Sequence, residues 1–167
     1  MTVAQRLGRF LLAPFKPTLR VVEVQEPKEG AAEQMVLTAR DQARLKGCAP
    51  ALITKVDQVL TALSAVGVTM FVTEGLRSTE RQQALYAQGR TAPGDRVTNC
   101  DGVVLKSNHQ AHDSDGFGHA VDLAFAGADP YAEAHPWTLY GLLAEQVGLK
   151  WGGRWTSPHD RPHVELP

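Results

Sequence analysis

Apolar residues recur at helical spacing in two long segments of the chain. The first begins at Pro50 and ends before Gly67, and its apolar face is formed by Leu52, Val56, Val59, Leu60 and Leu63. The second ends at Gly148, and its apolar face is formed by Trp137, Tyr140, Leu143, Ala144 and Val147. Both segments are predicted to be helices with one buried face.

Capping residues predict two shorter helices. Thr38 with Asp41 indicates a helix start that Gly47 stops. Thr79 with Gln82 is typical of a helix cap, and this helix is expected to run through residues 88–89. The sequence therefore alternates short and long helices through its first half.

Three segments have the length and composition of strands. Residues 68–73 form a β-branched run, residues 120–125 follow a Gly-Phe-Gly element, and residues 163–166 close the chain. Residues 91–110 between the first two are rich in turn-forming pairs such as Pro93-Gly94 and Asp101-Gly102. The strands are thus predicted to be separated by helices and by one long irregular segment.

Residues 1–34 differ from the rest and are interpreted as a basic extension and linker, with a domain at 35–167. Within residues 1–20 there are four cationic side chains and no acidic one, and apolar residues recur at helical spacing up to Pro14. A short amphipathic helix there could contact an anionic envelope surface weakly. A terminal helix that docks on the domain or frays is the alternative.

Composition excludes several classes of protein. The 167 residues suffice for one domain with a sizeable core, and the formal net charge of −1 gives no case for nucleic acid. The apolar run at residues 10–13 is too short for a membrane span or a signal peptide. Cys48 and Cys100 form no motif; isolated cysteines are most often free thiols, and the sequence leaves open whether these two pair.

Three separated fragments carry residues suited to a metal site. They are Ser107-Asn108-His109, then Gly118 to Asp122, then Asp160-Arg161-Pro162-His163. Two histidines and a carboxylate are the usual ligands of a catalytic zinc that keeps one position open for water. Asp160 could then serve as the base that such a water needs.

Strand parity separates His119 from Asp122. Successive side chains of a strand point to opposite faces, so His119 cannot share an ion with an inward Asp122. His109 and His112 compete for the remaining position, and composition leaves both open. A buried Asp122 needs a cation, which a metal ion or an arginine such as Arg77 would supply. An ordinary set of hydrogen-bonded side chains is the alternative.

Four motifs in order resemble the zinc peptidases of the D-alanyl-D-alanine carboxypeptidase family, in particular their bacteriophage L-alanyl-D-glutamate endolysins. They are Ser-x-His, Gly-His-Ala-Val-Asp, Trp-Gly-Gly and Asp-x-Pro-His, and residues 73–78 also look similar. The resemblance covers residues 37–166. It implies an α+β fold, with a small antiparallel sheet flanked by helices, as in hedgehog and D-Ala-D-Ala-peptidase-like proteins.

The resemblance also implies roles for individual residues. His109, Asp122 and His163 match the ligands of Zn²⁺, Asp160 the acid/base, and Arg77 the residue that polarises the scissile carbonyl. Ser107 matches a supporting serine beside the first ligand. A wall of the substrate groove is expected from Trp151, Gly152 and Gly153.

The chain departs from the family pattern between the first two ligands. Twelve residues separate His109 from Asp122, about six more than in the compact motif, so part of residues 110–117 is expected to loop out. His109 is preferred because Ser107 precedes it, and His112 is the alternative ligand. Asp113 and Asp115 in this loop could hold a calcium ion or could simply be solvated.

The implied function is cleavage of the L-Ala–D-Glu bond of peptidoglycan stem peptides during phage or prophage lysis, by a monomer. A D-Ala-D-Ala carboxypeptidase and a non-catalytic zinc-containing wall-binding module are the alternatives. Without a signal peptide, the protein is expected to be made in the host cytoplasm. It would reach the wall through a lesion made by another factor.

Overall fold

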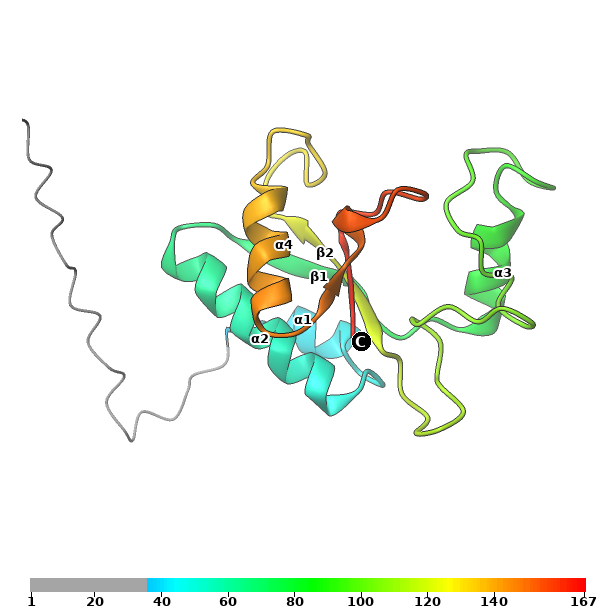
Figure 1. Ribbon diagram of the computed structural model, residues 1–167, viewed down its shortest axis with the longest axis horizontal. Coiled ribbons are helices and arrows are strands. Elements are labelled where there is room, and N and C mark those ends of the chain that lie inside the picture. The colour runs from blue at the N-terminus through cyan, green and yellow to red at the C-terminus, as the bar shows by residue number, and fades with distance from the viewer. Residues whose placement is uncertain (1–35) are drawn as a thin grey trace, which may run out of the picture. The chain divides into compact units, whose positions relative to one another are not determined.

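The computed structural model describes residues 36–167, which contain a four-stranded antiparallel sheet with helices (Figure 1). The sheet order is β1-β2-β4-β3, with bounds Met70–Glu74 (β1), Ala120–Phe125 (β2), Lys150–Trp151 (β3) and His163–Glu165 (β4). The helices are α1 (Ala39–Arg44), α2 (Pro50–Ala65), α3 (Thr79–Ala87) and α4 (Trp137–Gln146), and Gly152–Arg154 forms a 3-10 turn. The predicted α+β class is confirmed.

Most predicted elements are present, with two differences. The two-residue strand β3 was not expected, because it is too short to show a periodicity. The cap predicted for α3 is wrong: Ser78 is the N-cap, and its hydroxyl accepts a hydrogen bond from the Arg81 amide at 3.2 Å. The predicted extension and linker at residues 1–34 lie outside the described residues.

Helices α2 and α4 pack together against one face of the sheet (Figure 1). Val121 and Leu123 of β2 and Val164 of β4 are at most 1% exposed and face these helices. Because side chains alternate along a strand, Asp122 and His163 must point to the opposite face. In Figure 1 α3 and the loops around it lie on the far side of the sheet from α2 and α4.

A register shift between β1 and β2 moves one acidic side chain. Val72 pairs with Leu123, but Glu74 pairs with Asp122 because the register shifts between Val72 and Glu74. Without the shift, Glu74 would share the face of Val72, which is buried in the core. The shift therefore places Glu74 on the same side of the sheet as Asp122.

Two further expectations concern the thiols and the membrane. Cys48 is buried, Cys100 is half-buried, and both are free thiols. Across residues 36–167, no helix combines the length and the apolar character that crossing a membrane requires.

Candidate metal centre

His109, Asp122 and His163 each direct one ligand atom toward a common point. Nε2 of His109 lies 3.2 Å from Nδ1 of His163 and 3.3 Å from Oδ1 of Asp122, and the latter two atoms are 3.2 Å apart. Ligand atoms at about 2.0–2.1 Å from a tetrahedral zinc ion would be roughly 3.3–3.4 Å from one another. The three distances therefore fit a tetrahedral ion with a fourth position left for water.

The outer nitrogen of each imidazole faces a hydrogen-bond acceptor. Nδ1 of His109 lies 2.9 Å from the carbonyl oxygen of Gly75, which can only accept. Nε2 of His163 lies 3.0 Å from Oε2 of Glu165. With a proton on its outer nitrogen, each ring can present the lone pair of its inner nitrogen beside the carboxylate oxygen of Asp122. Three acceptors that face one another need a cation between them, either a metal ion or a proton.

The charges of the group shift the pKa values of its members. Burial opposes ionisation of Asp122, but the charges and hydrogen bonds of His109 and His163 outweigh it and hold the pKa of that carboxyl well below its usual range. Burial also opposes a charged His163, yet hydrogen bonds with Asp122 and Glu165 raise the pKa of His163 to about 9. The pocket thus stabilises positive charge at its centre.

Sheet register and backbone contacts bring the three residues together. Asp122 of β2 lies directly opposite His163 of β4 in the antiparallel pair. His109 lies in an irregular segment whose backbone is anchored to the turn after β1: the Arg77 amide donates to the His109 carbonyl at 2.8 Å. Ser107 accepts a hydrogen bond from the His109 amide at 3.3 Å, consistent with a supporting position.

The extra residues between His109 and Asp122 form a loop whose ends meet. The His119 amide donates to the Asn108 carbonyl at 2.7 Å, so the chain leaves and re-enters the site at neighbouring points. The structure places His112 and His119 outside the group of three, with their rings stacked at 3.8 Å between centroids.

The two acids of this loop have cationic or histidine partners. Asp113 accepts from Lys106 at 2.6 Å, and Asp115 lies 2.7 Å from Nε2 of His119. Each carboxylate therefore contacts a side chain, and neither acid belongs to the group of potential metal ligands found among the described residues.

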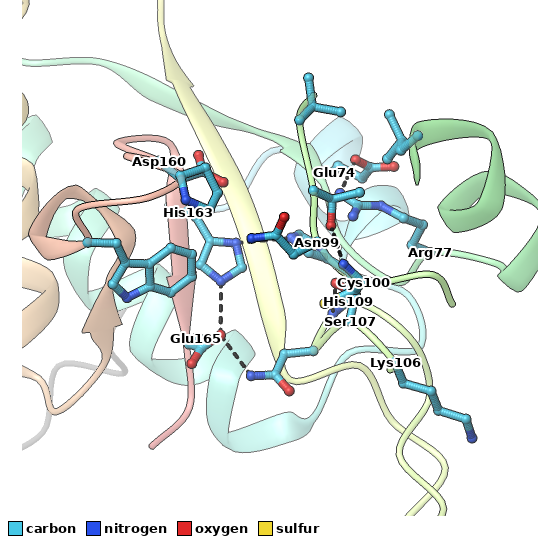
Figure 2. Close-up of a pocket in the computed structure, with 16 residues that line it drawn as sticks. Glu74, Arg77, Asn99, Cys100, Lys106, Ser107, His109, Asp160, His163 and Glu165 are labelled. Carbon is cyan, nitrogen blue, oxygen red and sulfur yellow. Dashed lines mark hydrogen bonds and ion pairs between the residues drawn. The ribbon is translucent and has the colours of Figure 1, made fainter. Parts of the chain in front are cut away.

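A cavity of about 390 Å³ opens beside the candidate ligands and is lined by Asp160 (Figure 2). Burial, followed by the negative charge of Asp122, raises the pKa of the Asp160 carboxyl. The Asp160 amide donates to the Gly152 carbonyl at 3.1 Å, and a Cβ at Gly152 would meet the Asp160 carbonyl oxygen at 2.4 Å. Gly152 therefore lets the chain that carries Asp160 approach closely.

Arg77 lines the same cavity, and its guanidinium contacts three side chains. Its Nη2 donates to Glu74 at 2.5 Å and lies 3.5 Å from Oδ2 of Asp122, while Nη1 donates to Gln82 at 2.8 Å. Its buried Nε atom has no hydrogen-bond partner among the described residues. The guanidinium is thus oriented from two sides toward the ligand group.

Gln82 contacts Arg77, and the sequence did not predict this contact. It is fully buried, and its amide nitrogen donates to Thr98 and to the carbonyl of Cys100. Gln82 lies in α3 and Arg77 lies before the helix, so their separation of five residues gives no helical-face signal for this contact.

The three residues that were expected to form a groove wall do not line the cavity. Trp151 is 6% exposed, packs in the core and donates its indole N–H to the Arg161 carbonyl at 2.8 Å. The cavity lining includes Trp155 and Pro158, and none of Trp151, Gly152 and Gly153. Trp155 packs against His163 with ring centroids 4.8 Å apart. Trp151 instead supports the chain that leads to His163.

Comparisons with known proteins agree with this architecture. A family model described as D-alanyl-D-alanine carboxypeptidase matches residues 104–166. The peptidoglycan L-alanyl-D-glutamate endopeptidase CwlK of Bacillus subtilis (strain 168) is 30% identical over 128 residues, which cover 70% of this chain and 72% of CwlK.

Solved structures share the fold. The L-Ala D-Glu endopeptidase ChiX of Serratia marcescens matches with a TM-score of 0.56 at 24% identity, over 82% of this chain and 94% of ChiX. The vancomycin resistance D,D-pentapeptidase VanY, solved in complex with Zn(II), matches with a TM-score of 0.52 at 18% identity, over 71% of this chain and 72% of VanY.

Proposed function

Because this chain belongs to the D-alanyl-D-alanine carboxypeptidase family of peptidases, we propose that it is a zinc peptidase that hydrolyses the L-Ala–D-Glu bond of peptidoglycan stem peptides. The choice of bond is supported by the name of the 30% identical relative, an L-alanyl-D-glutamate endopeptidase. The choice of zinc is supported by the ligand set and by the Zn(II) complex of VanY.

One observation carries the proposal: one potential ligand atom each from His109, Asp122 and His163 lies 3.2–3.3 Å from the other two. The other ring nitrogen of each histidine faces a hydrogen-bond acceptor. His109, Asp122 and His163 would hold the ion through these atoms. When bound, zinc supplies a Lewis acid that lowers the pKa of water to about 7 and polarises a carbonyl.

The protein's own side chains would move the protons and orient the substrate. Asp160 would take a proton from the attacking water and pass it to the leaving amine, a role that its raised pKa favours. Arg77, held by Glu74 and Gln82, would donate to the scissile carbonyl oxygen as negative charge develops there. Trp155 would form one side of the groove beside His163.

Digestion of purified peptidoglycan tests the bond that is cut. Mass spectrometry of the products is expected to find new L-alanine carboxyl ends and new D-glutamate amino ends. Release of free D-alanine without new L-alanine ends would instead identify a D-Ala-D-Ala carboxypeptidase, the activity that names the matched family model. A protein that binds peptidoglycan and zinc but releases no product would be a wall-binding module.

We further propose that this activity serves lysis of a bacterial host by a phage or prophage. Co-expression with a factor that opens the inner membrane is expected to lyse the cells. Lysis should disappear in the Asp160→Asn variant, and its persistence would assign lysis to the membrane factor alone.

A further inference from the structure

One carboxylate beside the candidate ligands has no role in the chemistry above. Glu165 follows His163 by two positions in β4, so both side chains point to the same face of the sheet. The Glu165 side chain is only 13% exposed and lines the cavity. A buried carboxylate is costly unless its contacts are specific.

The contacts of Glu165 join two ligand-bearing segments. Its Oε2 atom lies 3.0 Å from Nε2 of His163 and accepts a hydrogen bond from Nδ2 of Asn108 at 2.7 Å. Figure 2 shows the dashed line from the His163 ring to Glu165 and a second one from Glu165 to a neighbouring amide. Asn108 directly precedes His109, so one oxygen links β4 to the segment that carries the other histidine.

We propose that Glu165 is a positioning residue of the metal centre. Its carboxylate holds the proton of His163 on Nε2, so that Nδ1 faces the metal, and it ties β4 to the segment of His109. The inference rests on the proposed function only in that the group binds zinc. In this role Glu165 acts through His163 and not on the reacting atoms.

The chemistry of imidazole explains why a carboxylate is needed at this place. A neutral imidazole carries its proton on either nitrogen, and a proton on Nδ1 would block the ligand atom of His163. An anionic acceptor at Nε2 favours the productive tautomer and makes Nδ1 a better donor to a metal ion. His109 has only a neutral acceptor, the carbonyl of Gly75, so the two ligands are held by partners of different charge.

Zinc titration of the metal-free, full-length protein tests the proposal. Glu165→Gln keeps the shape and one acceptor oxygen but removes the charge, and it is expected to weaken zinc binding by about 10–100-fold. Glu80→Gln is the matched control, since Glu80 is an exposed residue in the first turn of α3, and its zinc affinity should equal that of the wild type. Unchanged affinity in Glu165→Gln would overturn the proposal.

A second measurement needs no variant of Glu165. Nitrogen-15 NMR of the zinc-loaded wild-type protein is expected to show His163 with a protonated Nε2 and a metal-bound Nδ1. Coordination of His163 through Nε2 would overturn the inference even if the protein is an active peptidase. A wild type that binds no zinc at His109, Asp122 and His163 would instead overturn the proposed function.

Discussion

Nε2 of His109 lies 3.2 Å from Nδ1 of His163, and each ring directs its other nitrogen away from this pair toward a hydrogen-bond acceptor. The acceptors are the Gly75 carbonyl and the Glu165 carboxylate. Two imidazoles therefore present lone pairs to each other only if a cation or an added proton lies between them.

Removing a ligand should have a larger effect than removing His112, the alternative to His109. His163→Ala is expected to lose more zinc affinity than the roughly 10–100-fold expected for a residue that only supports a ligand, and to lose hydrolysis with it. His112→Ala should keep both, because the His112 ring stacks on His119 outside the ligand group. Metal content after dialysis and release of soluble wall fragments are the measurements. Loss of zinc in His112→Ala would contradict the assignment of His109.

Asp160→Asn should separate metal binding from catalysis. The amide cannot take a proton from water, so hydrolysis is expected to fall by about 10²–10⁴-fold while zinc content stays at the wild-type level. Asp95→Asn provides the control, since Asp95 is exposed and lies outside the cavity lining. Rates of peptidoglycan digestion and metal analysis of the same samples give the result. An Asp160→Asn variant as fast as wild type would remove Asp160 from the mechanism.

The geometry of Arg77 should matter as well as its charge. Arg77→Lys keeps a cation but cannot reach Glu74 and Gln82 together, so kcat/KM is expected to fall by about 10²–10³-fold with zinc affinity retained. Arg81→Lys is the matched change, because Arg81 is 56% exposed and lies 3.6 Å from Glu74. Equal effects of the two changes would argue against a specific role for Arg77.

Stability of the metal-free protein should fall as pH rises above neutrality. Hydrogen bonds raise the pKa of His163 from 6.5 to about 9 against the effect of burial, so the folded state holds this proton more tightly than the unfolded state. The stabilisation is complete below pH 6.5 and is lost as pH rises toward 9, by at most about 1.4 kcal/mol per pH unit.

Urea unfolding at intervals from pH 6 to 9.5, with a chelator present, measures this dependence. His163→Gln serves as the reference, since it lacks the titrating ring. A wild-type curve parallel to that of His163→Gln would show that His163 holds no extra proton in the folded state.

Deletion of residues 1–34 tests the predicted boundary and the envelope contact together. The remaining chain contains every described element and the whole candidate centre, so digestion of purified peptidoglycan should be unchanged. Activity on permeabilised cells with anionic membranes is expected to fall modestly if the extension contacts the envelope. Replacing Arg6 and Arg9 by glutamine in the full chain should reproduce that fall. Equal activity of all three proteins on cells would leave the extension without this role.

Much of the fold could be predicted because its signals are local. Apolar spacing identified α2 and α4, and a β-branched run and a terminal segment identified β1 and β4. Strand alternation also separated Asp122 from His119 before any contact was known. Very short elements such as β3 were not predicted, because two residues show no periodicity and form a strand only through pairing in the tertiary fold.

The sequence by itself determined which residue types lie on which strand face and in which order the motifs occur. Only the tertiary structure brought His109, and not His112, to Asp122 and His163. The loop between His109 and Asp122 closes where Asn108 meets His119, so its extra residues do not displace the ligand atoms. The tertiary structure also decided the position of Glu74, which a register shift turns toward Asp122. Contacts between strands and loops depend on pairing and closure, which residue periodicity does not encode.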